Sequence, residues 1–374
     1  MKADNQSDIQ MFIDNKGDSM VAAQELKAIA DAESSPPSSP SSYFSCGLES
    51  DLADVHLQDD SDHSLFSIYT SAAPGLQNGK GAFANRDIRR GDLILSEKPI
   101  FSIPNNVPQP VKHTSTEAAV RNLSPTHLDN YLSLHNSHAE CSCSLRPLRG
   151  IFTTNSFRVS DSGEPAGGIC LKASRFNHSC SPNARFTFNS NTGDIRIYAL
   201  GTIPRGREIF IAYTPEDLLG RRLYGSPRQL RQATLRNQYH FTCECSICSL
   251  SEAESKVSDA RRQRIYAIWE SLGSYSLSQG AQCLNVIVEA IHLLKEEGNL
   301  SDTDGFTDKA GFFSAFHSDW VSTRYWVDLT YHSRVAEYGE DSAHAADVRK
   351  EYLDPKSYIL AGMGPAKDLT RFRV

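Results

Sequence analysis

The segment Cys243-Glu-Cys245-Ser-Ile-Cys248 is the strongest local signal in this chain of 374 residues. Zinc prefers four tetrahedral thiolate or imidazole ligands, and three thiolates at this spacing can surround one ion. The fourth ligand must come from elsewhere in the chain. Cys180, at the end of Arg175-Phe-Asn-His-Ser-Cys180, is the best candidate, and His240 is the alternative. The segment therefore predicts a structural zinc site, which we favour over a set of free or redox-active cysteines.

Short strand-forming runs precede this cysteine segment. Turn signals such as Asn78-Gly79 and Arg90-Gly91 separate the first three runs, and apolar residues alternate with polar residues in the later ones. These runs cover residues 65–69, 81–85, 92–100, 186–188, 195–197 and 209–213. The interval 115–135 instead favours two short helices, with Ser115 and Ser124 as their N-caps. The middle of the chain is thus predicted to be rich in short strands.

Helical periodicity begins at about Ala253 and continues toward the C-terminus. Apolar residues recur there at helical spacing in two clear stretches. These residues are Ile265, Ile268, Trp269 and Leu272, followed by Leu284, Ile287, Val288, Ile291 and Leu294. Two or three further helices fit between Phe312 and Tyr352, so we expect antiparallel helices that pack beside the strands.

Residues 1–63 are polar, acidic and poor in aromatic residues, which predicts a disordered segment. Residues 1–64 hold 13 Asp or Glu and 3 Lys, whereas the whole chain has a formal net charge of -7. The remaining part is close to neutral, so we expect no direct nucleic-acid binding. The chain shows neither a signal-peptide pattern nor an apolar run of membrane-spanning length. An intracellular location, in the nucleus or the cytoplasm and without membrane contact, is therefore expected.

The segment Asn177-His178-Ser179-Cys180-x-Pro182-Asn183 resembles the signature of SET-domain methyltransferases. In that family, the cysteine of this motif joins three post-SET cysteines on one zinc ion, which again points to Cys180. Four further segments resemble the same family, namely Asn78-Gly79-Lys80-Gly81, residues 150–157, Glu208-Ile-Phe-Ile-Ala-Tyr213 and Tyr239-His-Phe241-Thr-Cys243. The similarity covers roughly residues 65–250 and is closest to SMYD-like and fungal SET-five-like proteins.

The resemblance implies an α+β fold, in which a β-rich SET domain of short strands and a zinc-bound post-SET segment precede an α-helical C-terminal region. We predict a SET domain at 64–235 with an insert at about 102–150, a post-SET segment at 236–250 and helices at 251–374. SMYD proteins carry a two-zinc MYND finger in this insert, but the insert here has too few cysteines for one. A metal site at His135, His138, Cys141 and Cys143 is conceivable, although a loop without metal is favoured.

S-adenosyl-L-methionine (SAM) is the methyl donor of this family, and the resemblance assigns residues to it. The implied cofactor-binding residues are Lys80, Gly81, Ser174, Asn177, His178, Tyr213 and Phe241. Phe157, Tyr213 and Tyr239 resemble the aromatic channel that receives a lysine, and the Tyr213 hydroxyl would orient the amine and the methyl group. A free lysine has a pKa of about 10.4, which a desolvating aromatic channel would lower. Without the motif context, each aromatic residue would be interpreted as core packing.

The implied function is SAM-dependent transfer of a methyl group to the ε-amine of a lysine in a protein substrate, either a histone or another protein. The alternative is a catalytically silent SET scaffold that acts as a protein-interaction module. A third hypothesis is methyl transfer to a small molecule. An intact Tyr213 and an intact Asn-His-Ser-Cys motif favour the enzyme over the scaffold.

Overall fold

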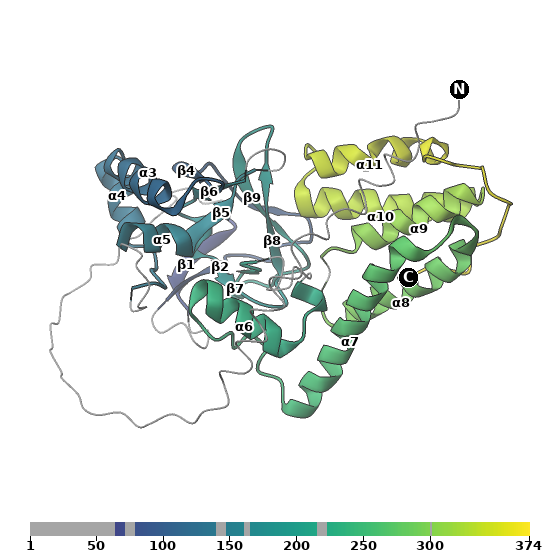
Figure 1. Ribbon diagram of the computed structural model, residues 1–374, viewed down its shortest axis with the longest axis horizontal. Helices are drawn as coiled ribbons and strands as arrows, with labels where there is room; N and C mark the ends of the chain where they lie inside the picture. Colours follow the sequence, from purple (N-terminus) through teal and green to yellow (C-terminus); the bar gives the residue numbers. More distant parts are fainter. Residues whose placement is uncertain (1–63, 72–78, 140–146, 161–164, 215–222, 300) are drawn as a thin grey trace.

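The computed structural model describes residues 64–374 with the exception of 72–78, 140–146, 161–164, 215–222 and 300. The acidic segment predicted to be disordered and the candidate ligands Cys141 and Cys143 lie outside the described residues. Figure 1 shows a β-rich part on one side and a bundle of helices on the other. None of the helices in the described ranges is long and apolar enough to cross a membrane. The predicted α+β fold class is confirmed.

The described strands of the β-rich part form four small sheets. An antiparallel pair joins β1 (Phe66–Thr70) to β2 (Lys80–Ala84), and a short parallel pair joins β7 (Asn177–His178) to β10 (Phe210–Ile211). The two three-stranded sheets have the orders β3-β9-β8 and β4-β6-β5. Their strands are β3 (Leu93–Glu97), β4 (Phe101–Pro104), β5 (Ser156–Arg158), β6 (Ala166–Ile169), β8 (Ala184–Asn189) and β9 (Asp194–Ala199). Most of the predicted strand runs are confirmed, although β10 ends at Ile211, before Tyr213.

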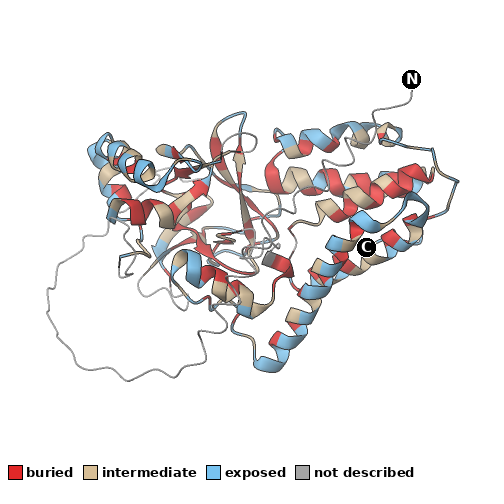
Figure 2. Cartoon of the chain, in the orientation of Figure 1, coloured by how far each residue is buried: buried red, intermediate tan, exposed pale blue. Residues whose placement is uncertain are grey.

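Alternation along the strands explains which residues form the core. In β9, Ile195 and Ile197 are fully buried against the inner faces of the neighbouring strands. Phe186 and Phe188 of β8 are only half-buried, because they line a large cavity. Figure 2 shows buried residues along these strands and along the inward faces of the C-terminal helices. The same alternation that builds the core therefore also supplies aromatic rings to the cavity wall.

The insert folds as three helices, α3 (Gln109–Arg121), α4 (Pro125–Leu132) and α5 (Pro147–Asn155). The predicted N-cap at Ser115 is wrong, because this residue lies inside α3. Pro110 stands in the first turn of α3, where the missing N–H of a proline costs no hydrogen bond. The predicted cap at Ser124 is confirmed, since its hydroxyl accepts a hydrogen bond from the N–H of His127 (3.3 Å). Apolar residues of α3, α4 and α5 pack with those of the sheet β4-β6-β5 in a second core.

Helix α6 (Arg228–Tyr239) leads from the β-rich part to the C-terminal helices. These are α7 (Glu252–Ser271), α8 (Gly280–Glu296), α9 (Asp304–Phe316), α10 (Trp320–Tyr338) and α11 (Ala343–Leu353). A capping box at Ser251 and Glu254 begins α7. Ile265, Ile268 and Leu272 are buried as predicted, whereas Trp269 is 37% exposed and packs one ring face near Phe306. The expected helical C-terminal region is thus present, with a helix register that the periodicity predicted.

A buried ionic cluster joins the strands to the C-terminal helices. Arg185 of β8 donates hydrogen bonds to Asp302 (2.9 Å) and Glu337 (3.0 Å), and its guanidinium lies 4.5 Å from the centre of the Tyr338 ring. Arg90 approaches the same Glu337 carboxylate at 3.7 Å. The Glu337 side chain is only 1% exposed, and its burial raises its pKa from 4.5 to about 7. The packing of α10 on β8 and β9 therefore depends on a desolvated carboxylate.

The raised pKa of Glu337 predicts how the stability of the protein depends on pH. Below pH 4.5 the folded and unfolded states both hold this proton, and between 4.5 and about 7 only the folded state does. Its contribution to stability is therefore lost as pH rises through that window, by as much as ~3 kcal/mol. Glutamine does not titrate. We therefore expect the melting temperature of Glu337→Gln to rise relative to that of wild type between pH 5 and pH 8. A difference that is constant with pH would contradict this assignment.

Candidate active site and zinc cluster

Four cysteine sulfurs converge at the start of the segment that follows α6. The Sγ atoms of Cys180, Cys243, Cys245 and Cys248 all lie within 4.8 Å of one another. The Sγ of Cys180 is 3.8 Å from that of Cys243 and 3.6 Å from that of Cys248. A tetrahedral zinc ion with Zn–S bonds of about 2.3 Å sets its sulfurs ~3.8 Å apart. The donor set therefore fits zinc in both chemistry and spacing.

The alternative fourth ligand, His240, does not join this group. It ends α6 in a left-handed conformation (φ 57°), and its Nε2 lies 3.1 Å from Nδ1 of His138 in the insert. His240 thus connects two distant segments at the cavity rim. Among the described residues, Cys180 is the one that completes the sulfur quartet, although it lies 63 residues before Cys243 in sequence.

Arg231 is a member of this site that the sequence motifs did not predict. Its side chain is fully buried, with Nη2 3.9 Å from the Cys248 sulfur and Nη1 donating to the carbonyl of Ser226 (2.6 Å). Burial acts to lower the pKa of Arg231, but the negative charges of Cys180, Cys248 and Asp259 together outweigh burial and raise that pKa. Four thiolates around Zn²⁺ carry a net charge of about -2, which a buried guanidinium stabilises.

We therefore expect Arg231→Gln to weaken metal retention. Removing the guanidinium leaves the excess negative charge of the cluster unbalanced in a desolvated site, and partners around metal ligands typically contribute about 10-fold or more to affinity. The measurement is the rate of zinc release to a chromogenic chelator. Arg264→Gln is the matched control, since Arg264 pairs with Glu289 on the exposed surface of α7 and α8. Equal release rates in the two variants would contradict the role of Arg231.

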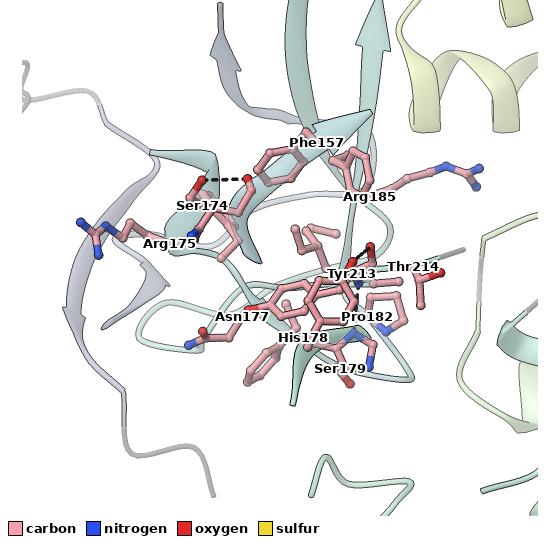
Figure 3. A pocket seen from close by; sticks show the side chains of 18 of the residues that line it. Phe157, Ser174, Arg175, Asn177, His178, Ser179, Pro182, Arg185, Tyr213 and Thr214 are labelled. Carbon is pink, nitrogen blue, oxygen red and sulfur yellow. Dashed lines mark hydrogen bonds between the residues drawn. The ribbon is translucent and has the colours of Figure 1, made fainter. Parts of the chain in front are cut away.

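One large cavity, of about 2520 Å³, lies between the strands, the insert, the cysteine quartet and the C-terminal helices. Its wall includes all but two of the predicted site residues, namely Phe157, Lys80, Ser174, Asn177, His178, Tyr213, Tyr239, Phe241, Cys180, Cys243 and Cys245. Gly81 and Cys248 are buried and do not line the cavity. Figure 3 shows Asn177, His178 and Tyr213 grouped together, with Phe157 across from them. Segments separated by more than 100 residues thus meet at one cavity.

His178 links the cysteine quartet to Tyr213. Its Nδ1 accepts a hydrogen bond from the backbone N–H of Tyr213 (3.1 Å), so the neutral ring carries its proton on Nε2. That Nε2 lies 3.4 Å from the Cys180 sulfur and donates toward it. Burial lowers the pKa of His178 to about 4, which keeps the ring neutral at pH 7. The imidazole is therefore a bridge between two parts of the site, a role that its motif alone does not indicate.

The aromatic rings of Tyr239 and Phe241 lie beside Tyr213, the predicted catalytic residue. The Tyr213 ring centre lies 5.2 Å from that of Tyr239 and 6.2 Å from that of Phe241. The Tyr239 hydroxyl donates to the carbonyl of Tyr213 (3.0 Å), and burial raises the pKa of Tyr239 to about 12. Burial also raises the pKa of Tyr213, and the nearby Tyr239 and Glu208 raise it further by smaller amounts. Both phenols therefore stay protonated at pH 7, as hydrogen-bond donors rather than bases.

Phe157 meets a second ring that the motifs did not single out. Its ring centre lies 5.1 Å from that of Phe186 in an edge-to-face arrangement. Both rings come from strands that border the cavity, β5 and β8. The period-two alternation of β8 was the signal for Phe186, but alternation cannot distinguish a core face from a cavity face.

Hydrogen bonds hold the side chain of Asn177, the first residue of β7. The Nδ2 atom of Asn177 donates to Glu208 (2.7 Å) and to the carbonyl of Lys80 (3.1 Å). Glu208 also accepts from the hydroxyl of Ser71 (2.9 Å). A Cβ atom at Gly81 would lie 2.2 Å from Oε1 of Glu208, so glycine is required there for this carboxylate to fit. Glu208 thus has a structural role, because it joins Ser71 to Asn177.

Ser174 and Asn183 complete the support of the site. The Ser174 hydroxyl donates to the carbonyl of Cys170 (2.6 Å), which stabilises the single turn before Asn177. The side chain of Asn183 accepts from the N–H of Phe210 (2.7 Å) and donates to the carbonyl of Glu208 (2.9 Å). Asn183 therefore aligns β10, the strand that leads to Tyr213.

The site and the fold define a SET domain. The SET domain family matches residues 79–214, the part of the chain that carries Lys80, Phe157, Asn177, His178 and Tyr213. The cysteine segment and the C-terminal helices lie beyond that match. The resemblance to SET-domain proteins of the SMYD and SET-five type is confirmed.

Among curated relatives, the histone-lysine N-methyltransferase set5 of Schizosaccharomyces pombe is 25% identical over 293 residues, which cover 78% of this chain and 86% of the relative. The N-lysine methyltransferase SMYD2 of Homo sapiens is 30% identical over 110 residues, 29% of this chain and 23% of the relative. The histone-lysine N-methyltransferase ASHR2 of Arabidopsis thaliana is 38% identical over 91 residues, 23% of this chain and 21% of the relative. The chain therefore spans most of set5 but only about a quarter of the other two.

Proposed function

We propose that this protein is a SAM-dependent protein-lysine methyltransferase. The observation that carries the proposal is the convergence of Asn177, His178, Tyr213 and Tyr239 on one cavity of a SET domain. Relatives named as histone-lysine and N-lysine methyltransferases support it. The substrate is a protein with an accessible lysine, either a histone or another protein, and the protein acts inside the cell, in the nucleus or the cytoplasm.

The residues around Asn177 fit the polar end of SAM. The Nδ2 atom of Asn177 is engaged with Glu208 and Lys80, which leaves the amide oxygen to accept from the ammonium of the methionine part. The ring of Phe241 lies 6.2 Å from that of Tyr213 and offers a face for the adenine. Bound SAM supplies an electrophilic methyl group on a sulfonium. We assign Lys80, Gly81, Ser174, Asn177, His178 and Phe241 to its binding, with Gly81 acting through the backbone.

The aromatic residues favour the uncharged form of the substrate lysine. An ε-ammonium that enters among Phe157, Tyr213 and Tyr239 loses water, which lowers its pKa and favours the neutral amine. The Tyr213 hydroxyl, a donor and acceptor at pH 7, orients the amine in line with the methyl carbon. The amine proton leaves to solvent, because the raised pKa of Tyr213 keeps it a neutral phenol and the lowered pKa of His178 makes its imidazole a weak base.

A bound zinc ion would order the far wall of the cavity. The quartet Cys180, Cys243, Cys245 and Cys248 would hold it, and Tyr239 and Phe241 immediately precede Cys243. Folding of this segment around the ion would therefore fix both rings in the cavity wall beside Tyr213. We propose the boundaries 64–235, 236–250 and 251–374 for the SET, post-SET and helical parts.

Transfer of label from radiolabelled SAM by the purified protein, onto a cell extract and onto core histones, tests the function. A labelled protein band identifies the substrate. No label on any protein, with SAM still bound, would favour a small-molecule substrate, and the absence of binding would favour the silent scaffold.

We expect SAM to raise the melting temperature of the protein. A ligand at 100 times its Kd that binds only the folded state stabilises it by about 2.7 kcal/mol. Asn177→Ala should abolish most of this shift, because it removes the amide that we assign to the cofactor. Asn189→Ala, on the far end of β8, is the control that should retain the shift. An unchanged melting temperature of the wild type in SAM would contradict cofactor binding.

A further inference from the structure

Two turns with similar sequences lie side by side on the SET domain. Residues 86–92 (Arg-Asp-Ile-Arg-Arg-Gly-Asp) and 202–207 (Thr-Ile-Pro-Arg-Gly-Arg) pair through a bridge between Ile88 and Ile203. The carboxylate of Asp87 accepts from the N–H of Arg205 (2.8 Å), and the N–H of Ala84 donates to the carbonyl of Arg207 (2.9 Å). We call this paired structure the arginine turns.

The arginine turns carry five arginines and two aspartates. Arg90 points toward α10, where it meets Ser333 and Glu337. Arg86, Arg89, Arg205 and Arg207 are exposed, and none of them forms an ion pair within the described part of the chain. The two aspartates are already engaged with backbone N–H groups of the turns themselves. The turns therefore present four exposed guanidinium groups without carboxylate partners of their own.

The acidic N-terminal segment enters the fold beside these arginines. The side chain of Asn85, the residue before Arg86, donates to the carbonyl of Ser64 (3.1 Å), and the N–H of Asn85 donates to the carbonyl of Leu65 (2.9 Å). The run Asp59-Asp60-Ser-Asp62 precedes Ser64 in sequence and is separated from it by His63 alone. A chain spans at most about 3.5 Å per residue, so the run is tethered to Ser64 by a backbone length of at most ~18 Å.

We propose that the acidic run Asp59–Asp62 docks on the arginine turns and holds the N-terminal segment against the SET domain. Charge complementarity and the entry point at Asn85 argue for this occupant. Single exposed ion pairs are weak, but the short tether gives the carboxylates a high effective concentration at the turns. Because Gly206 and Arg207 line the cavity, the docked segment would lie at its rim. This inference does not depend on the proposed function.

Limited digestion with an endoproteinase that cleaves before aspartate tests the docking on the full chain. The readout is the rate of cleavage at Asp59 to Asp62, measured by mass spectrometry relative to cleavage at Asp14 and Asp18 in the same molecule. The double variant Arg86→Gln/Arg205→Gln removes one guanidinium from each turn. We expect it to raise the relative cleavage rate at Asp59 to Asp62 by about threefold, and we expect 1 M NaCl to abolish the difference by screening.

The matched control is Arg236→Gln/Arg349→Gln, which removes two exposed arginines from α6 and α11 and should leave the relative cleavage rate unchanged. The melting temperatures of both variants should match wild type, because none of the four side chains forms an ion pair in the described chain. Equal relative cleavage in wild type and Arg86→Gln/Arg205→Gln would overturn the proposal. An equal increase in the control variant would also overturn it, because the effect would then follow net charge rather than the turns.

Discussion

Tyr213→Phe is expected to lower methyl transfer by about 10²-fold or more while leaving SAM binding nearly unchanged. The hydroxyl of Tyr213 forms no hydrogen bond with any other described side chain, so its loss breaks no contact of the fold. The ring contacts with His178, Tyr239 and Phe241 are retained in phenylalanine. What is lost is the group that orients the amine, and misplacement of a reacting group by 1 Å can cost about 10²-fold in rate.

Tyr239→Phe provides a graded comparison for this experiment. Its hydroxyl donates to the Tyr213 carbonyl, so the substitution removes one neutral hydrogen bond, worth about 1 kcal/mol. We therefore expect a loss of about fivefold in transfer, much smaller than that of Tyr213→Phe. The measurement is incorporation of labelled methyl groups into protein, with the SAM-induced shift in melting temperature recorded for each variant. A turnover of Tyr213→Phe equal to that of wild type would contradict the catalytic role of Tyr213.

Cys245→Ser is expected to lose zinc and to destabilise the segment after α6. The loss of a structural metal ranks among the largest effects of single substitutions, and we expect a decrease of about 4 kcal/mol or more in unfolding free energy. Methyl transfer should fall as well, because Tyr239 and Phe241 depend on the same segment for their positions. The measurements are elemental analysis of the purified protein and its melting temperature.

Cys283→Ser is the matched control for the cysteine substitution. Cys283 is fully buried among the C-terminal helices and belongs to the core of α7, α8 and α9, away from the quartet. Its replacement should lower stability modestly through a buried hydroxyl, yet leave one equivalent of zinc in place. Undiminished zinc in Cys245→Ser would rule out the proposed ligand set.

The difference between Cys245 and Cys180 illustrates how far sequence reasoning extends. Cys245 stands in a dense cluster, whose spacing predicts metal binding wherever the segment lies in the fold. The contribution of Cys180 could be inferred only from its motif, because no local pattern connects residues so far apart in sequence. The structure brings the four sulfurs together and leaves His240 outside, with His138 as its neighbour.

The predicted N-caps show the same limit at a local scale. Ser124 caps α4 as expected, but Ser115 lies within α3, since the helix begins before it. A good cap residue is only a preference, and Val120, which packs in the core of the insert, shows that α3 is held by its tertiary contacts.

The sequence by itself determined the periodic elements, the three clustered cysteines and the aromatic and polar residues whose motifs resemble a SET domain. These are properties of short segments, where spacing alone sets which side chains share a face or can reach one ion. Only the tertiary structure decided the partners of the buried polar groups: Arg231 with Cys248, His178 with Cys180 and Tyr213, and Arg185 with Glu337. The physical reason is that a buried charge or imidazole must find its partner on whichever distant element packs against it, and no local pattern records that element.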